Sequence, residues 1–371
     1  MPESWARSQR FDHRAIRRIA VFRALQLGDL LCAVPAFRAL RHGFPRSRIT
    51  LIGLPWAEEF VRRFTACLDD LLPFPGYPGL PEQVPDPPLF ARFLLEARRR
   101  RFDLAIQMHG NGATTNALTV LLGAGVTAGH CPPDGWCPDP LTFLPYPEDR
   151  SEVHRLLALA EFLGAPARGD HLEFPVTGAD RLAFASLNAI HRLEPHAYVC
   201  IHPGSQLPSR RWPADRFAAV GDALAARGYR IVLTGSSQEI DLTRSVRAAM
   251  HHPALDLAGR TTLGALAVLL DGARLLVSND TGLSHLAAAR RVSSVIVACG
   301  SDPLRWAPAN RGLHRVVFEP VTCRPCAHVV CPIGHPCALG VSIDTVLAHV
   351  DAVLQATRPS PRDQHECAVP R

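Results

Sequence analysis

Short apolar segments alternate with longer amphipathic segments along most of this chain of 371 residues. The apolar runs predict buried strands, and the amphipathic stretches between them predict helices. Strands that alternate with helices indicate parallel sheets with helices on both faces. The rhythm occurs twice, separated by an irregular segment. We therefore expect an α/β protein with two doubly wound, Rossmann-like domains that face an interdomain cleft.

The expected elements define the domain boundaries. In the first half we expect strands at 19–25, 49–54 and 104–107 and helices at 30–42, 89–100 and 152–163. The proline-rich segments 73–88 and 127–147 are predicted to be irregular. In the second half we expect strands at 198–201, 230–234, 274–278 and 295–298 and helices at 214–227, 237–249, 263–270 and 283–289. The predicted domains are 1–175 and 176–340, followed by a helix within 341–357 and a disordered tail, 358–371.

The sequence VSNDTGLSHLAAA (277–289) predicts a strand, a turn and the start of a helix. Asp280, Thr281 and Gly282 lie where the strand ends, and His285 follows one helical turn later. The start of a helix offers unpaired N–H groups and a positive dipole end, which bind anions. Gly282 would let a phosphate approach the backbone closely. The alternative is an ordinary crossover in which Asp280 or Thr281 caps the helix.

A second loop, HPGSQLPSRRWP (202–213), follows another apolar strand. It combines glycine and serine with the adjacent Arg210 and Arg211, and arginine forks match phosphate oxygens. The alternative is a solvated surface loop. Two such loops after strands of one parallel sheet would open at the same carboxyl edge, where open α/β folds bind ligands. Together they favour a diphosphate site.

Composition limits the classes of function. All 40 basic residues are arginine, and the formal net charge of +6 fits an anionic substrate or membrane surface without requiring nucleic acid. No apolar run approaches the ~20 residues that span a bilayer. The N-terminal residues lack the apolar core of a signal peptide, so we expect a cytoplasmic protein. Peripheral contact with the inner face of the cytoplasmic membrane is compatible with this expectation.

Eight of the eleven cysteines fall into two groups. Cys32, Cys67, Cys200 and Cys299 lie in apolar stretches and are predicted to be small buried side chains. A second group lies close together in sequence, with His328 and His335 between its members: Cys323, Cys326, Cys331 and Cys337. Their later spacing is not that of a standard zinc finger, so we expect a reduced loop without metal and leave a structural metal open.

The order of several motifs resembles glycosyltransferase family 9, the ADP-heptose:lipopolysaccharide heptosyltransferases. These motifs are RALQLGDLLCAVPAFRAL (23–40), the two loops above, YRIVLTGSSQEI (229–240) and LDLAGRTTLGALAVLLDGARLL (255–276). The resemblance spans about residues 19–350. It implies the GT-B fold, with the nucleotide sugar bound mainly by the second domain. It also implies an inverting, metal-independent transfer that needs no cofactor beyond an ADP-sugar co-substrate.

The resemblance also assigns residue roles. Asp29, beside Gly28 in a predicted loop, becomes the general base, because a positioned carboxylate can take the proton of an attacking hydroxyl. Its alternative role is to cap the following helix. Arg210 is preferred over Arg211 as the cation that stabilises the departing nucleotide. The predicted substrate-binding residues are Gly28, Ser205, Arg211, Glu239, Asp280, Thr281, Gly282 and His285, with Ala258, Gly259 and Leu263 lining the adenine.

The acceptor is expected to be a glycan or glycolipid hydroxyl in lipopolysaccharide core or related surface-glycan synthesis, and no nucleic-acid partner is expected. The residues that could face the acceptor or an anionic membrane are His109, Gly110, Asn111, Asn116, Arg62, Arg63 and the run 98–101. Each could instead be an ordinary surface residue. Two other functions stay open: a nucleotide-sugar epimerase of the same fold, or a non-catalytic protein that binds nucleotide sugars.

Overall fold

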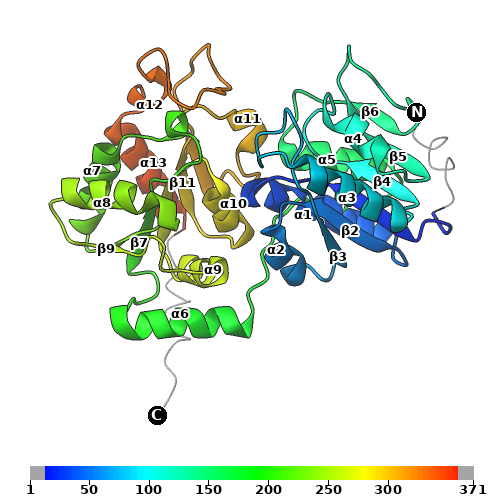
Figure 1. Ribbon diagram of the computed structural model, residues 1–371. Helices are drawn as coiled ribbons and strands as arrows, with labels where there is room; N and C mark the ends of the chain where they lie inside the picture. Colours follow the sequence, from blue (N-terminus) through cyan, green and yellow to red (C-terminus); the bar gives the residue numbers. More distant parts are fainter. Residues whose placement is uncertain (1–12, 358–371) are drawn as a thin grey trace. The chain divides into compact units, whose positions relative to one another are not determined.

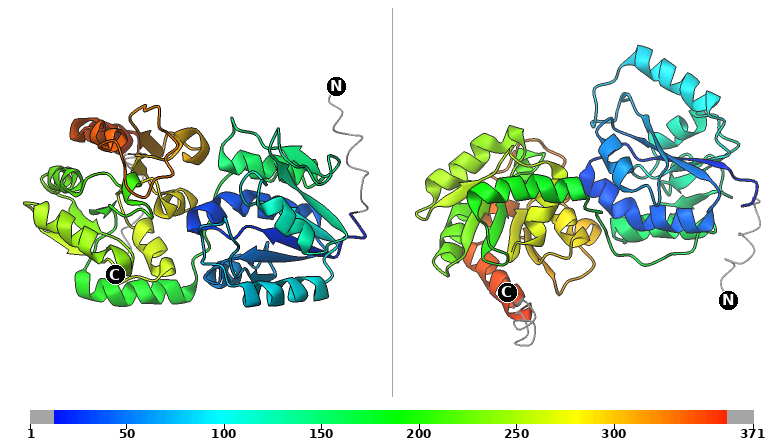
Figure 2. Two further views of the ribbon diagram at one scale, coloured as in Figure 1. Left: turned by 45° about the horizontal axis from the view of Figure 1, so that its top comes forward. Right: turned by 90° about the horizontal axis from the view of Figure 1, so that it is seen from below.

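The computed structural model describes residues 13–357 and divides the chain into two compact units, Met1–Pro175 and Val176–Arg371 (Figure 1). The predicted tail, 358–371, lies outside the described residues. Each unit holds one parallel six-stranded sheet with helices on both of its faces (Figures 1 and 2). The likeness of the two units confirms that the strand–helix rhythm is repeated.

Unit 1 has the strand order β3-β2-β1-β4-β5-β6. Its strands are β1 Arg18–Phe22, β2 Arg48–Gly53, β3 Asp70–Pro73, β4 Leu104–Gln107, β5 Val126–Cys131 and β6 Phe143–Pro145. Its helices are α1 Leu27–Gly43, α2 Ala57–Arg63, α3 Pro87–Arg99, α4 Thr115–Leu121 and α5 Glu152–Phe162. One face of the sheet packs against α3 and α4 through Phe93, Ala97, Leu118 and Leu122, while α1 and α5 pack against each other.

Unit 2 has the order β12-β11-β10-β7-β8-β9, which is the same topology read from the other edge. Its strands are β7 Tyr198–His202, β8 Arg230–Leu233, β9 Ala254–Asp256, β10 Leu275–Asn279, β11 Ser294–Val297 and β12 His314–Val317. Its α-helices are α6 Gly178–His191, α7 Ala214–Ala225, α8 Ile240–Ala249, α9 Leu263–Asp271, α10 Gly282–Ala289, α11 Pro303–Trp306, α12 Pro336–Leu339 and α13 Ile343–Ala356. Two short 3-10 turns, η2 Pro208–Arg210 and η3 Ser237–Glu239, lie in its loops.

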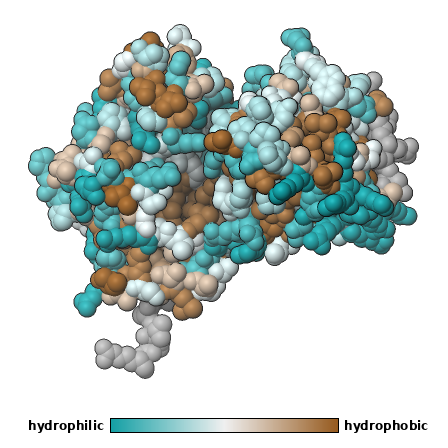
Figure 3. Space-filling model, in the orientation of Figure 1, coloured by the Kyte–Doolittle hydropathy of each residue, from teal (hydrophilic) through white to brown (hydrophobic). Residues whose placement is uncertain are grey.

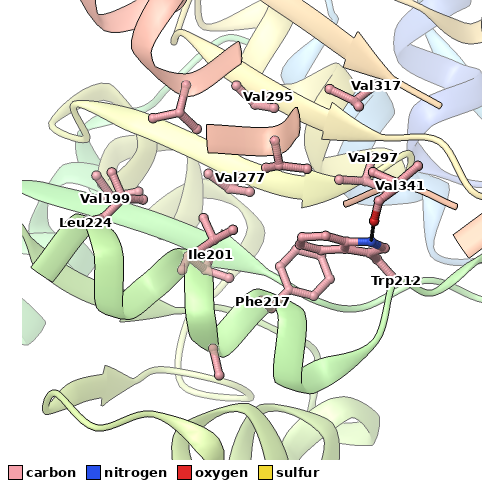
Figure 4. Close-up of a cluster of buried hydrophobic side chains, with 14 of the residues drawn as sticks. Val199, Ile201, Trp212, Phe217, Leu224, Val277, Val295, Val297, Val317 and Val341 are labelled. Carbon is pink, nitrogen blue, oxygen red and sulfur yellow. Dashed lines mark hydrogen bonds between the residues drawn. The ribbon is translucent and has the colours of Figure 1, made fainter. Parts of the chain in front are cut away.

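The core of unit 2 is built from the aliphatic face of its sheet and the helices α7 and α13 (Figure 4). Val277 and Val297 of the central strands meet the rings of Trp212 and Phe217, which pack edge-on at 5.1 Å. The Trp212 indole also donates to the Val341 carbonyl at 3.1 Å. Because Trp212 ends the loop 202–213, this core fixes one end of that loop.

Two sequence predictions about unit 1 are wrong. Segment 127–147 is not irregular throughout, since it contains most of β5 and all of β6; its prolines lie between these strands or at the outer edge, where a missing N–H does no harm. Gly28 and Asp29 are not in a loop, because α1 begins at Leu27. An acidic residue in the first turn suits the positive end of the helix dipole.

Candidate functional site

The strand order of each unit reverses beside its first strand, and ligands of doubly wound sheets bind at the carboxyl ends of the strands at this point. In unit 2 the reversal lies between β7 and β10. The two loops singled out from the sequence, 202–213 and 279–282, follow these two strands. The sheet therefore brings both loops to one edge of unit 2.

Asn279, the last residue of β10, joins the two loops through its buried side chain. Its Nδ2 donates to the carbonyls of Pro203 at 2.7 Å and Gly204 at 3.3 Å. Its Oδ1 accepts from the Trp212 N–H at 2.9 Å. One amide thus fixes both ends of the 202–213 loop beside the start of α10. Sequence reasoning missed this role, although an asparagine at the end of an apolar strand was a usable signal.

The start of α10 leaves Asp280, Thr281 and Gly282 partly exposed above buried residues. The Ser284 hydroxyl donates to the Thr281 carbonyl at 2.7 Å and accepts from the Thr281 N–H at 3.4 Å, which fixes the first turn. His285 is buried, and its ring lies 6.1 Å from the Trp306 ring in an edge-on arrangement. The Asp280 N–H donates to the Val297 carbonyl at 3.1 Å, so the backbone donors that this helix start presents to an anion begin at Gly282.

Glu239 lies against the first loop, at the end of η3. Its carboxylate accepts from the N–H of Ser236 at 2.8 Å and from the Ser236 hydroxyl at 2.9 Å. A Cβ added to Gly204 would lie 2.0 Å from Glu239 Oε1, so a larger residue at this position would displace the Glu239 carboxylate. Gly235 also packs between Glu239 and Ala258, so Ala258 of the predicted adenine-lining segment lies close to Glu239.

The pKa of Glu239 reflects opposing effects. Burial raises it, but the charge of His202, the hydrogen bonds from Ser236 and the charge of Arg211 together lower it below its usual value. Burial in turn lowers the pKa of His202, so that imidazole is neutral near pH 7. At neutral pH, Ser236 and Arg211 therefore keep Glu239 ionised.

The adjacent arginines point to different partners. Arg211 Nε donates to the Ser205 carbonyl at 2.9 Å, so its side chain lies along the loop that holds Ser205. Arg210 Nη2 donates to the Cys326 carbonyl at 2.9 Å, and the Arg210 side chain packs beside Gly300. The geometry thus places Arg211, rather than the preferred Arg210, next to the other candidate residues of this loop.

The η2 turn is hydrogen-bonded to the segment that contains Cys323, Cys326, Cys331 and Cys337. His335 Nε2 lies 2.7 Å from the Ser209 carbonyl, and the His335 N–H donates to Cys331 Sγ at 3.1 Å. Among residues 13–357 no group of three or more His, Cys, Asp or Glu side chains is arranged to hold a metal ion. Cys32, Cys67, Cys200 and Cys299 are buried, as predicted.

In unit 1, Asp29 occupies the third position of α1 and is partly exposed, whereas Gly28 is buried. Asp29 Oδ2 accepts from the Gln26 N–H at 3.3 Å, so the carboxylate does cap the helix. The cap also orients the side chain at the carboxyl end of β1. Capping and a role as base are therefore compatible.

Sequence reasoning also missed a buried ion network directly behind Asp29. Arg23 is completely buried; its Nε donates to the Asp29 carbonyl at 2.9 Å, one Nη to the Met108 carbonyl, and the other Nη to Glu152 Oε1 at 2.9 Å. Glu152 also lies 3.7 Å from Arg155. Arg23 thus connects the ends of β1 and β4 with the start of α5. A lone arginine after an apolar strand was the only sequence signal.

The predicted acceptor residues differ in exposure. His109 and Asn116 are buried: the His109 ring stacks on Phe22 at 5.2 Å, and Asn116 Nδ2 donates to the His130 carbonyl at 3.0 Å. Gly110 is partly exposed and Asn111 is exposed.

The two arginines of α2, in contrast, are already paired. Arg62 binds Glu58 and Arg63 binds Glu59, each across one helical turn. The side chains of α2 therefore balance their own charges.

The model of Glycosyltransferase family 9 (heptosyltransferase) matches residues 91–336 of the chain. Lipopolysaccharide heptosyltransferase 3 of Escherichia coli is 33% identical over 119 residues, which are 31% of this chain and 35% of that protein. The aligned part thus spans about a third of this relative's length.

Solved structures share the fold over nearly the whole chain. A glycosyl transferase family 9 protein from Veillonella parvula has a TM-score of 0.73 at 21% identity and covers 92% of this chain and 98% of its own. E. coli ADP-heptose lps heptosyltransferase II has a TM-score of 0.68 at 20% identity, and the match covers 92% of this chain and 99% of the E. coli chain. These likenesses confirm the predicted GT-B-like fold.

Proposed function

Because the chain belongs to glycosyltransferase family 9 (heptosyltransferase), we propose that it moves heptose, or a related sugar, from an ADP-sugar to a hydroxyl of a glycan or glycolipid. The name of the E. coli structural neighbour, an ADP-heptose lps heptosyltransferase, supports the donor and the pathway. The similar E. coli relative is named for lipopolysaccharide, which supports a role in core or related surface-glycan synthesis.

The proposed reaction inverts the anomeric carbon in one displacement. The acceptor oxygen forms a bond to that carbon while the bond to the diphosphate oxygen breaks, and ADP leaves with the electron pair. Asp29 takes the proton of the attacking hydroxyl as general base. The bond from the Gln26 N–H orients the Asp29 carboxylate, and Arg23 holds the Asp29 carbonyl.

Unit 2 is proposed to bind the donor. The segment of Asp280, Thr281 and Gly282 at the start of α10 would meet the diphosphate. Gly282 would supply its N–H, because the Asp280 N–H donates to the Val297 carbonyl and the Thr281 N–H donates to the Ser284 hydroxyl. A fixed cation would stabilise the charge on departing ADP without a metal. The contact of Arg211 with Ser205 favours Arg211 for this part over Arg210.

Two further residues complete the proposed donor site. Glu239, held by Ser236 beside Gly204, would bind a ribose hydroxyl. His285 would pack near the same phosphates, buried beside Trp306.

The proposed reaction uses no cofactor other than the ADP-sugar. We place it in the cytoplasm, at the inner face of the membrane where a glycolipid acceptor would be presented. Within residues 13–357 the structure contains no helix that is long and apolar enough to cross a bilayer.

The observation that carries the proposal is the joining of the two loops of unit 2 by Asn279. The test is calorimetric titration of the protein with ADP, GDP and UDP. We expect ADP to bind most tightly, and Arg211→Met to weaken ADP by about tenfold or more, because a charge-assisted contact to phosphate is lost. Arg244→Met, at an exposed ion pair of α8, is the matched control and should bind as the wild type does. Absence of ADP binding would overturn the proposal.

A further inference from the structure

The outward face of α3 combines arginine with exposed leucine. Arg92, Leu95, Arg98 and Arg99 follow each other at three- and four-residue spacing, and all four are exposed. Leu95 is 57% exposed, whereas Phe93 and Ala97 on the opposite face are buried in the core. The helix is thus attached to unit 1 by one face and leaves an apolar and cationic face uncovered.

The end of α4 extends this face. Arg98 Nε lies 3.4 Å from the Leu121 carbonyl, and the aliphatic part of Arg98 lies beside Gly123. Val120 and Leu121 are each 40% exposed. Brown and teal surfaces lie side by side over the part of unit 1 that α3 and α4 form (Figure 3). We call the surface formed by Arg92, Leu95, Arg98, Arg99, Val120 and Leu121 the α3 face.

The nearby acidic side chains do not neutralise these arginines. Glu96 of the same helix pairs with Arg100 at 3.0 Å, and Asp70 pairs with Arg100 at 2.7 Å. Asp103, beyond the helix end, accepts from the backbone N–H groups of Arg17 and Arg18. In α2, by comparison, each arginine has its own glutamate. The α3 face therefore keeps its positive charge.

We propose that the α3 face is a docking surface for an anionic lipid bilayer. Leucine and valine side chains enter the boundary between headgroups and acyl chains, while the arginine stems cover apolar surface and their guanidinium groups bind lipid phosphates. Three cations that form no ion pair with an acidic side chain of residues 13–357 complement a negative lipid surface. So few aliphatic side chains give only weak, reversible attachment, and the arginines supply the selectivity for anionic lipid.

The proposal extends the proposed function, since a protein that glycosylates a membrane lipid must reach the bilayer surface. Its test does not depend on that function, because vesicle binding needs neither donor nor acceptor. If the protein binds vesicles but transfers no sugar, the enzymatic proposal fails and the docking surface stands.

The experiment is cosedimentation of the purified chain with phosphatidylcholine vesicles, with and without phosphatidylglycerol. We expect binding only to the anionic vesicles, with binding reduced as salt is raised. The variant Arg92→Gln/Arg98→Gln/Arg99→Gln should lower the partition coefficient by about fivefold per arginine. Leu95→Glu should abolish binding, because a carboxylate would then lie in the apolar part of the face.

The matched control removes three exposed arginines from unit 2, as Arg244→Gln/Arg247→Gln/Arg260→Gln. It lowers the net charge equally and should keep wild-type binding. Circular dichroism melting verifies that each variant is folded. The proposal is overturned if the wild type ignores anionic vesicles, or if the control loses as much binding as the α3 variant does.

Discussion

Replacing Arg23 by methionine tests the ion network behind Asp29. The guanidinium is fully buried, and the Glu152 side chain is only 4% exposed. Removing one partner of a buried ion pair costs about 3–5 kcal/mol, because the other charge stays buried. Arg155 lies 3.7 Å from Glu152 and partly neutralises the carboxylate that Arg23→Met leaves behind, so we expect the lower end of this range. The Met108 and Asp29 carbonyls also lose their donors, at about 1 kcal/mol each.

We therefore expect Arg23→Met to lower the free energy of unfolding of unit 1 by roughly 4–6 kcal/mol. The assay is hydrogen exchange followed by mass spectrometry, which reports each unit separately, whereas a single two-state fit does not suit a protein with two units. Protection should fall in β1, β4 and α5 and stay unchanged in β7 and β10.

The double variant Arg23→Met/Glu152→Met removes both charges and should recover much of the loss, since no unpaired carboxylate is left in the core. The reasoning is refuted if the single change costs less than about 1 kcal/mol, the size of one ordinary hydrogen bond. It is also refuted if the double variant is no more stable than the single one.

Three further changes test other parts of the structure. Asn279→Ala leaves the Trp212 N–H and the Pro203 carbonyl without their partner. Calorimetry should therefore find unit 2 about 2–3 kcal/mol less stable and the affinity for ADP at least tenfold lower. An ADP affinity within twofold of the wild type would exclude the role of the amide. Burial lowers the pKa of His130 from 6.5 to about 4, so the folded state binds fewer protons than the unfolded state. The free energy of unfolding should therefore fall as pH falls from 6.5 towards 4. Denaturant titrations should show that His130→Phe flattens this dependence on pH. Burial raises the pKa of Asp222, but hydrogen bonds from His251 and His252 outweigh this effect and lower that pKa from 3.8 to about 2. The contribution of Asp222 to the free energy of unfolding should therefore vanish as pH falls from 3.8 to 2. Asp222→Asn lacks the titrating carboxyl, so its melting should not show this dependence on acid.

The sequence predicted the elements with strong periodicity and failed where composition misled. Long amphipathic helices such as α1, α7 and α13 and central strands such as β7 and β10 lie within a few residues of their expected positions. The strands β5 and β6 were missed because prolines surround them, and the three-residue β9 is too short to show a period. Pairing with neighbouring strands, rather than local preference, forms these three strands.

The candidate site was predictable where it lies in one continuous loop and unpredictable where it depends on distant contacts. Topology alone implied that the loops after β7 and β10 would share an edge, and the structure places them there. No local pattern distinguishes Arg210 from Arg211, because the difference lies in their partners, Cys326 and Ser205. The pairing of Arg23 with Glu152 spans 129 positions and has no local signature.

The most direct test of the proposed mechanism measures two properties of the Asp29→Asn variant, its rate of sugar transfer and its affinity for ADP. The asparagine oxygen can still accept from the Gln26 N–H, so the start of α1 is preserved while the basic carboxylate is lost. We predict a fall in the transfer rate by about 10²–10⁴, with ADP binding unchanged, since the donor is assigned to unit 2. Transfer at the wild-type rate in Asp29→Asn would contradict the account.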